Sequence, residues 1–276
     1  MQGISWLLKK DGFPLKGFDA YIESSVPMGS GLSSSAAFEV SLTRALSKAF
    51  SLGMDDVAIA RFSQRVENEF VGARVGIMDP MAASICEVGT ALFLDARDLS
   101  FEKIVLPGEL ELIVINSGVS HSNVGGDYNT RRGECEAACK QLNVGLLRDL
   151  EFKDLPLLDP LPHHLKKRSR HVLTENQRVF DAVKAIKVSD LETLGKLFNE
   201  SHVSMRDDYE ISIPEIDMLV SIAQEHPQIY GARLTGGGFG GSIVAAAKKG
   251  TAADAADEIS KTYQKRSMKK SVVLVP

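Results

Sequence analysis

The order of apolar and polar positions predicts a strand followed by several helices in the first part of the chain. Strict alternation over Gly17–Ser25 predicts a strand. A loop of small residues follows at 27–35, and apolar residues at helical spacing then predict a helix over Ala36–Phe50. Further helices are expected to begin near Asp55 and at Asp79-Pro80, since acidic residues and proline both suit a first helical turn.

The remainder of the chain, from about Ala91 onward, is predicted to contain both strands and helices. Strands are predicted at Ala91–Asp95, Glu109–Asn116, Ala232–Thr235, Ser242–Ala247 and Ser271–Val275. Helices are predicted at Arg131–Leu142, Arg170–Ile186, Leu191–Met205, Pro214–Ala223 and Ala252–Lys265, with an irregular stretch at Leu155–Pro162. Because strands and helices mix without strict alternation or internal repeat, the pattern indicates an α/β or α+β protein with two layers per domain.

Composition narrows the class of protein. With 276 residues, 44% hydrophobic and 25% charged, the chain is expected to fold into one large or two ordinary globular domains. A formal net charge of −4 gives no basic field for nucleic acid, and no apolar run reaches the ~18–20 residues of a membrane span. The N-terminus lacks the pattern of a secretory signal. The chain has three cysteines and no second Cys or His pair that would complete a zinc site with them. They are therefore interpreted as reduced thiols, and a cytoplasmic protein is expected.

Two glycine-rich segments carry the candidate chemistry. The loop at 27–35 joins a predicted strand to a predicted helix, which is the layout of an anion site built from backbone N–H groups. Its serines could instead simply cap the helix, although one serine suffices for a cap. The second segment, Leu234–Gly241, has five glycines in six positions between two apolar strands. A plain hairpin needs one or two, so close backbone approach or positive φ is indicated there.

Pro27-Met28-Gly29-Ser30-Gly31-Leu32-Ser33-Ser34-Ser35-Ala36 resembles the phosphate-binding motif of the GHMP small-molecule kinases, and Leu234–Gly241 resembles their C-terminal glycine motif. Three further segments are similar to the galactokinase branch of that family: Gly76-Ile77-Met78-Asp79, Arg206–Ser212 and Pro214–Asp217. The resemblance extends from about Gly17 to the end of the chain. It implies an α+β, two-domain GHMP kinase fold, with a truncated N-terminal domain at 1–108 and a ferredoxin-like C-terminal domain at 109–276.

The resemblance also implies roles for particular residues in transfer of phosphate from ATP to O1 of galactose. Ser35 and Glu67 match positions that hold Mg²⁺, and Asp79 matches the base. The phosphates of the nucleotide would lie on the loop formed by Pro27, Gly29, Ser30, Gly31, Leu32, Ser33 and Ser34. Gly76 and Tyr128 match positions that contact the sugar, and Gly237 and Gly238 belong to the loop near the transferred phosphate.

From the residues alone, each assignment has a plainer alternative. Asp79 could be the N-cap of a helix, Glu67 a solvated helix residue and Tyr128 an ordinary loop aromatic. The charge run Arg206–Asp208 could face solvent or could brace the floor of an active site. Hard oxygen ligands such as Ser35 and Glu67 nevertheless suit Mg²⁺, and a carboxylate is a credible acceptor of a hydroxyl proton.

The sequence also departs from the galactokinase pattern. The signature Gly-Arg-Val-Asn-Leu-Ile-Gly-Glu-His-x-Asp-Tyr, which grips the sugar in that family, does not occur, and Pro80 replaces a glutamine. Unpaired strand edges are therefore expected, covered by a partner or a homo-oligomer. The alternative function is a non-catalytic or truncated relative that binds nucleotide and turns over sugar poorly. Another specificity within the family, such as an N-acetylgalactosamine or arabinose kinase, is a third possibility.

Overall fold

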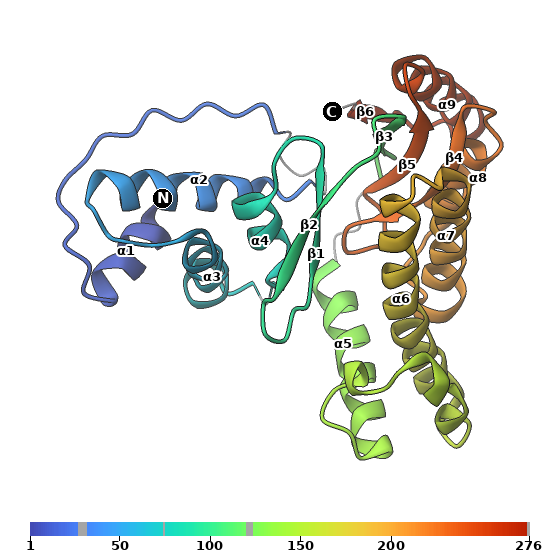
Figure 1. Cartoon of the computed structure of the whole chain (residues 1–276), viewed down its shortest axis with the longest axis horizontal. Coiled ribbons are helices and arrows are strands. Elements are labelled where there is room, and N and C mark those ends of the chain that lie inside the picture. The colour runs from blue at the N-terminus through green and yellow to red at the C-terminus, as the bar shows by residue number, and fades with distance from the viewer. Residues whose placement is uncertain (27–31, 74, 120–123, 275–276) are drawn as a thin grey trace. The chain divides into compact units, whose positions relative to one another are not determined.

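The computed structural model describes residues 1–26, 32–73, 75–119 and 124–274. The chain divides into two compact units, Met1–Leu106 and Pro107–Pro276, which are described separately (Figure 1). Within the described ranges, no helix combines the length and the apolar character needed to cross a membrane.

The first unit consists of helices and one β-hairpin. Its elements are α1 (Gln2–Lys10), α2 (Ser34–Ala49), α3 (Asp56–Val66), a π-helical turn (Glu67–Val71), α4 (Met78–Ile85), β1 (Thr90–Leu94) and β2 (Phe101–Val105). The predicted helices after the loop and at Asp55 and Asp79 are confirmed; Asp55 caps α3 by accepting a hydrogen bond from the N–H of Ala58 (2.7 Å). The pattern did not predict α1, whose Ile4, Leu7 and Leu8 are fully buried, or the mostly exposed β2.

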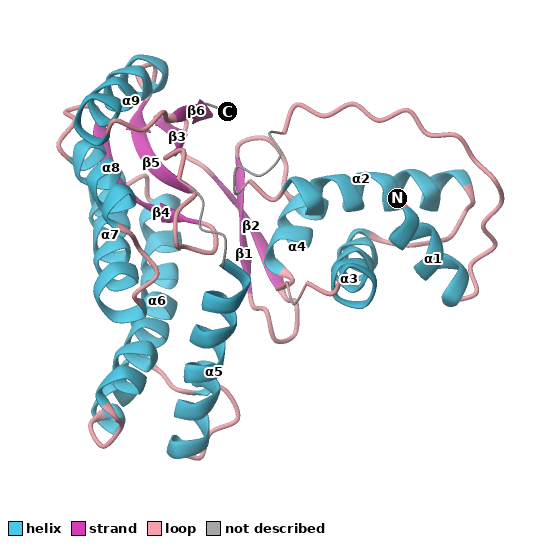
Figure 2. Cartoon of the chain, turned by 180° about the vertical axis from the view of Figure 1, so that it is seen from behind, coloured by secondary structure: helices cyan, strands magenta, loops and turns pink. Residues whose placement is uncertain are grey.

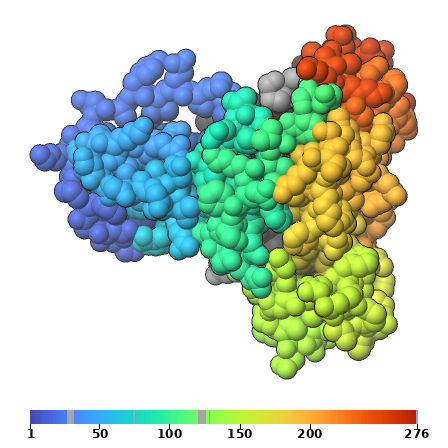
Figure 3. All heavy atoms as spheres, viewed as in Figure 1, coloured from blue at the N-terminus to red at the C-terminus, as the bar shows by residue number. Residues whose placement is uncertain are grey.

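The predicted strand at Gly17–Ser25 is wrong. This segment is a long connection between α1 and α2 without regular secondary structure, and it follows the outer surface of the first unit (Figure 3). Its residues alternate as a strand would, but a strand also needs a neighbour with a free hydrogen-bonding edge. In the described part of the chain, the only partner of β1 is β2, and no strand pairs with 17–25. Tyr21 is 91% exposed as a result.

The second unit combines a four-stranded sheet with long helices. Its elements are β3 (Leu110–Asn116), α5 (Val124–Leu142), short 3₁₀ turns (Leu147–Asp149 and Phe152–Leu158), α6 (His163–Lys187), α7 (Leu191–Ser204), a second π-helical turn (Met205–Tyr209), α8 (Pro214–Gln224), β4 (Ile229–Thr235), β5 (Ser242–Lys248), α9 (Ala252–Ser267) and β6 (Val272–Leu274). All the elements predicted for this half are present. Helices α5 and α6 begin earlier than predicted. For α6 the reason is that Pro162 ends the irregular stretch and the helix follows it directly.

The sheet has the order β4-β5-β3-β6, with antiparallel pairing throughout. Read along the chain this is strand, helices, two strands, helix, strand, which is the ferredoxin-like arrangement predicted for this half. Helices α8 and α9 pack against the sheet through fully buried apolar residues (Figure 2), among them Ile216, Leu219, Ala256 and Tyr263. The core therefore lies between the sheet and these two helices.

Helix α7 lies along the outer edge of β4. The side-chain oxygen of Asn199 accepts a hydrogen bond from the N–H of Ala232 (2.9 Å), and Nδ1 of His202 accepts one from the N–H of Leu234 (3.4 Å). The backbones approach so closely at Gly195 and Gly231 that a Cβ on Gly231 would lie 2.0 Å from the carbonyl oxygen of Gly195. These two positions therefore require glycine for packing rather than for an unusual φ.

We predict that Gly231→Ala lowers the free energy of unfolding by about 3 kcal/mol or more, because two backbones would have to move apart. Gly133→Ala is the matched control: Gly133 is exposed on α5, a Cβ there meets nothing within 4 Å, and helix propensity favours alanine by about 0.5–1 kcal/mol. Urea denaturation of both variants measures the difference. Equal stability of Gly231→Ala and the wild type would contradict the close approach.

Candidate functional site

The structure describes the predicted phosphate loop from Leu32 onward; Pro27, Gly29, Ser30 and Gly31 lie outside the described residues. Ser33 precedes α2 with left-handed backbone angles (φ 53°, ψ 40°). Its carbonyl accepts the first helical hydrogen bond, from Ala37 (3.0 Å), but its side chain does not cap the helix. Among the described residues, no side chain caps this first turn, whose N–H groups point out of the helix.

Instead of capping α2, the Ser33 hydroxyl donates a hydrogen bond to Oδ2 of Asp79 at 2.5 Å (residues 46 apart in the chain). Two of the predicted site residues are thus in direct contact. Asp79 is exposed and is the second residue of α4, which begins at Met78 after Ile77 as N-cap. The capping role considered for Asp79 is therefore excluded, and its carboxylate is held by Ser33.

Pro80 follows Asp79 as the third residue of α4 and is buried. A proline in the first turn removes an N–H that has no acceptor within the helix. Pro80 is therefore compatible with the first turn of α4, which continues to Ile85.

Glu67 begins the π-helical turn that follows α3, and its side chain is half-buried. Its carboxyl lies near that of Glu39, which is on the buried face of α2 and is only 5% exposed. Burial and, after it, the nearby carboxyl of Glu67 raise the pKa of Glu39 to about 8. The second oxygen of Glu39, Oε2, has no hydrogen-bond partner in the described residues.

Glu39 was not predicted as a site residue. The available signal was its position: it shares the apolar face of α2 with Ala36, Thr43 and Leu46, and an acidic residue is seldom buried without a partner.

The predicted metal ligands lie on separate helices. Ser35 is exposed on the first turn of α2, while Glu67 belongs to the π-helical turn after α3. Within the described residues, no group of three or more His, Cys, Asp or Glu side chains could hold a metal ion on its own. The exposed Ser35 hydroxyl and the half-buried Glu67 carboxyl carry hard oxygen donors of the kind that Mg²⁺ takes together with phosphate and water.

Of the two predicted sugar-contacting residues, Gly76 is exposed directly before α4. The preceding Val75 is held by α3 and its π-helical turn, since Asn68 accepts from its N–H (3.0 Å) and Gln64 donates to its carbonyl (3.1 Å). A Cβ at Gly76 would meet nothing within 4 Å, so space remains open beside it. Tyr128 belongs to α5, but its side chain lies outside the described residues.

The glycine-rich loop Gly236–Gly241 lies in the second unit, between β4 and β5. Positive φ occurs at Gly236 (84°), Gly238 (85°), Phe239 (58°), Gly240 (127°) and Gly241 (79°). This run explains the glycine content, because other residues rarely adopt such angles. The N–H of Phe239 donates to the carbonyl of Ile211 (2.7 Å) and that of Gly241 to Val119 (2.9 Å), so the loop is attached at two points.

Residues 2–87 match the GHMP kinases N terminal domain, and residues 182–265 match the GHMP kinases C terminal domain. Galactokinase of Mannheimia succiniciproducens is 43% identical over 257 residues, which cover 91% of this chain and 67% of that protein. The chain belongs to the galactokinase family of GHMP kinases.

Other galactokinases are also similar to this chain. Galactokinase of Streptomyces coelicolor is 44% identical over 248 residues, covering 88% of this chain and 64% of that protein. The crystal structure of Lactococcus lactis galactokinase complexed with galactose matches with a TM-score of 0.92 at 30% identity, over 99% of this chain and 73% of that one. The two-domain GHMP kinase fold predicted from the motifs is thereby confirmed. The chain spans about two thirds of the length of its curated relatives.

The raised pKa of Glu39 predicts a pH dependence of stability in magnesium-free buffer. The folded chain keeps a proton on Glu39 up to about pH 8, whereas the unfolded chain loses it near pH 4.5. Between these values unfolding releases a proton, so stability falls as pH rises, by at most about 1.4 kcal/mol per pH unit. Glu39→Gln, which needs no proton, should show a flatter profile and exceed the wild type in stability at pH 8.

Urea denaturation between pH 5 and pH 8 tests this prediction. The control is Glu23→Gln, which changes an exposed glutamate in the segment before the loop and should keep the wild-type slope. A slope in Glu39→Gln equal to that of the wild type would show that Glu39 does not bind the proton.

Proposed function

We propose that this chain is an ATP-dependent sugar 1-kinase that phosphorylates galactose at O1. The observation that carries the proposal is the 2.5 Å hydrogen bond from Ser33 to Asp79, since it ties the phosphate-binding motif to the carboxylate that the resemblance assigns as base. The family membership supports the same reaction, because the relatives are named galactokinases and one was solved with galactose.

In this proposal the phosphates of ATP lie at the N-terminus of α2. The uncapped N–H groups there, together with the positive end of the helix dipole, favour an anion. Gly29, Ser30, Gly31, Ser33 and Ser34 belong to the same motif, flanked by Pro27 and Leu32. Mg²⁺, when held by Ser35 and Glu67, would offset the negative charge of the β- and γ-phosphates.

Asp79 performs the proton transfer. Ser33 fixes Oδ2, which leaves Oδ1 to accept the proton of the sugar O1 hydroxyl. As O1 forms its bond to the γ-phosphorus, the bond between that phosphorus and the β,γ-bridging oxygen breaks, and ADP leaves with the bonding electrons. The open space at Gly76 and the aromatic ring of Tyr128 are assigned to the sugar, and Gly237 and Gly238 to the loop beside the transferred phosphate.

The second candidate is a relative that binds nucleotide but turns over sugar poorly. The observation that favours it is that the chain spans only about two thirds of the length of the curated galactokinases. Both candidates share the nucleotide site, so they differ in sugar-dependent turnover and not in ATP affinity.

We predict that Asp79→Asn lowers galactose-dependent ADP release by about 10²- to 10⁴-fold, the usual contribution of a general base, and leaves ATP affinity unchanged. The measurement is coupled ADP detection with Mg-ATP and a hexose panel that includes galactose, N-acetylgalactosamine and arabinose. Asp19→Asn, which changes an exposed aspartate in the connection between α1 and α2, is the matched control.

An unchanged rate in Asp79→Asn would remove Asp79 from the mechanism. ATP binding by the wild-type chain without ADP release for any sugar would instead select the nucleotide-binding relative.

A further inference from the structure

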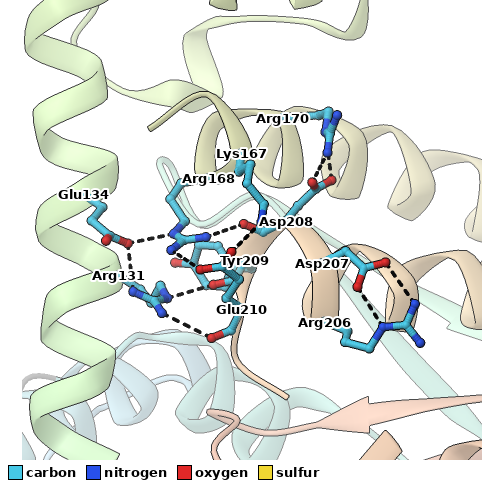
Figure 4. A network of polar contacts seen from close by, with 10 residues as sticks. All are labelled: Arg131, Glu134, Lys167, Arg168, Arg170, Arg206, Asp207, Asp208, Tyr209 and Glu210. Atoms are coloured by element: carbon cyan, nitrogen blue, oxygen red, sulfur yellow. Dashed lines mark hydrogen bonds and ion pairs between the residues drawn. The ribbon is translucent and has the colours of Figure 1, made fainter. Parts of the chain in front are cut away.

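A cluster of ion pairs joins α5 and α6 to the segment that follows α7 (Figure 4). At its centre is Arg168 on α6, whose side chain is 3% exposed. It donates to the carboxylates of Glu134 (2.7 Å) and Glu210 (2.7 Å) and to the carbonyl oxygen of Asp208 (2.6 Å). A guanidinium buried to this degree is stable only when its donors are paired, as they are here.

Arg131 on α5 reaches the same segment from the other side. It donates to the carbonyl oxygens of Tyr209 (2.7 Å) and Glu210 (3.2 Å), and a third N–H binds Glu134 (2.9 Å). Glu134 therefore links the two arginines, and together they bind three consecutive carbonyls at 208–210. Figure 4 shows both guanidinium groups directed at this backbone.

These carbonyls need such donors because the helix ends there irregularly. After α7 the backbone forms the π-helical turn Met205–Tyr209, and Glu210 then adopts a left-handed conformation (φ 55°). A left-handed non-glycine residue costs about 1–3 kcal/mol and persists where its surroundings fix it. Lys167 and Arg168 bind the Glu210 carboxylate and lower its pKa to about 2, so side chain and backbone are both held.

The charge run Arg206–Asp208 divides between two roles. Arg206 and Asp207 pair with each other on the surface (2.8 Å), whereas Asp208 is only 8% exposed and is bound by Arg170 (2.9 Å). Of these three residues, only Asp208 therefore contributes to fixing the segment.

The fixed segment leads directly to the glycine-rich loop. Ile211 follows Glu210, and its N–H donates to the carbonyl of Met205 (3.0 Å), which closes the π-helical turn. The carbonyl of Ile211 then accepts from Phe239 in the loop (2.7 Å). A Cβ on Gly238 would lie 2.6 Å from that same carbonyl oxygen, so loop and segment are in close contact with no space between them.

We propose that Arg131 and Arg168 are positioning residues for the loop Gly236–Gly241: they fix the carbonyls at 208–210 and thereby the Ile211 carbonyl on which the loop rests. This inference rests on the proposed function, in which that loop lies beside the transferred phosphate. Neither arginine touches substrate in this arrangement. Their effect on phosphoryl transfer passes through Ile211, Gly238 and Phe239.

The test compares Arg131→Met with Arg132→Met. The two arginines are adjacent on α5, but Arg132 is exposed and binds Glu136 on its own helix (3.0 Å). Hydrogen exchange followed by mass spectrometry or NMR measures protection of the Phe239 amide. In Arg131→Met this amide should exchange at least about tenfold faster, as local opening becomes less costly, while amides between β4 and β5 keep wild-type rates. Arg132→Met should match the wild type throughout.

Kinetics provide a second readout that a purely structural role would not give. A displaced loop should reduce kcat about tenfold to a hundredfold with the KM for ATP unchanged, since misplacement by about 1 Å has effects of this size. Arg131→Lys should recover part of the protection and of kcat, because one ammonium group can bind one of the two carbonyls. If Arg131→Met does not fold, Glu134→Gln keeps the shape and weakens the anchoring of both arginines.

Wild-type exchange at Phe239 in Arg131→Met, or equal acceleration in the loop and in β4 and β5, overturns the proposal. The exchange measurement requires no turnover. A wild-type chain that phosphorylates no sugar would therefore refute the proposed function while leaving the coupling between Arg131 and the loop open to the same test.

Discussion

Helices leave backbone polar groups unpaired at their ends, and this constraint governs both the start of α2 and the segment after α7. At the start of α2 these are N–H groups, and no side chain of the described residues caps them. At the end of α7 they are carbonyl groups, and two arginines bind them, the buried Arg168 and the half-buried Arg131. The same constraint thus has opposite outcomes. The donors at the start of α2, which no described side chain caps, favour an anionic ligand, whereas the carbonyls after α7 are bound by cationic side chains of the protein.

The two π-helical turns show how residue choice decides whether such support is needed. The turn Glu67–Val71 ends at Gly72 (φ 81°), and the turn Met205–Tyr209 ends at Glu210 (φ 55°). Glycine adopts a left-handed conformation at little cost, so the first turn needs no external anchor for its backbone. Glutamate does not, and its position therefore depends on contacts from α5 and α6. The second turn is fixed by residues remote in sequence, while the first relies on its own composition.

Sequence reasoning succeeded where the relevant signal is local. Amphipathic spacing predicted the helices from α2 to α9, and apolar runs predicted β3, β4 and β5, because the burial of one face sets the spacing of apolar residues that are close in sequence. The helix α1 was missed although its pattern is equally local. Sequence reasoning failed at Gly17–Ser25, where alternation is present but pairing depends on another strand. The motif match singled out Ser33 and Asp79, yet only the fold shows their contact across 46 positions. Glu39, Arg131 and Arg168 were missed for the same reason, since their partners lie on other elements.

The packing of α7 on β4 also bears on how chains of this protein can associate. An edge strand normally presents a row of free N–H and C=O groups on which a strand from another molecule can pair. On β4 the outward N–H groups of Ala232 and Leu234 are already bound by Asn199 and His202. The contact between Gly195 and Gly231 leaves no room for an intervening backbone. Growth of this sheet by strand addition at β4 would first require α7 to detach, so the helix protects this edge against aggregation.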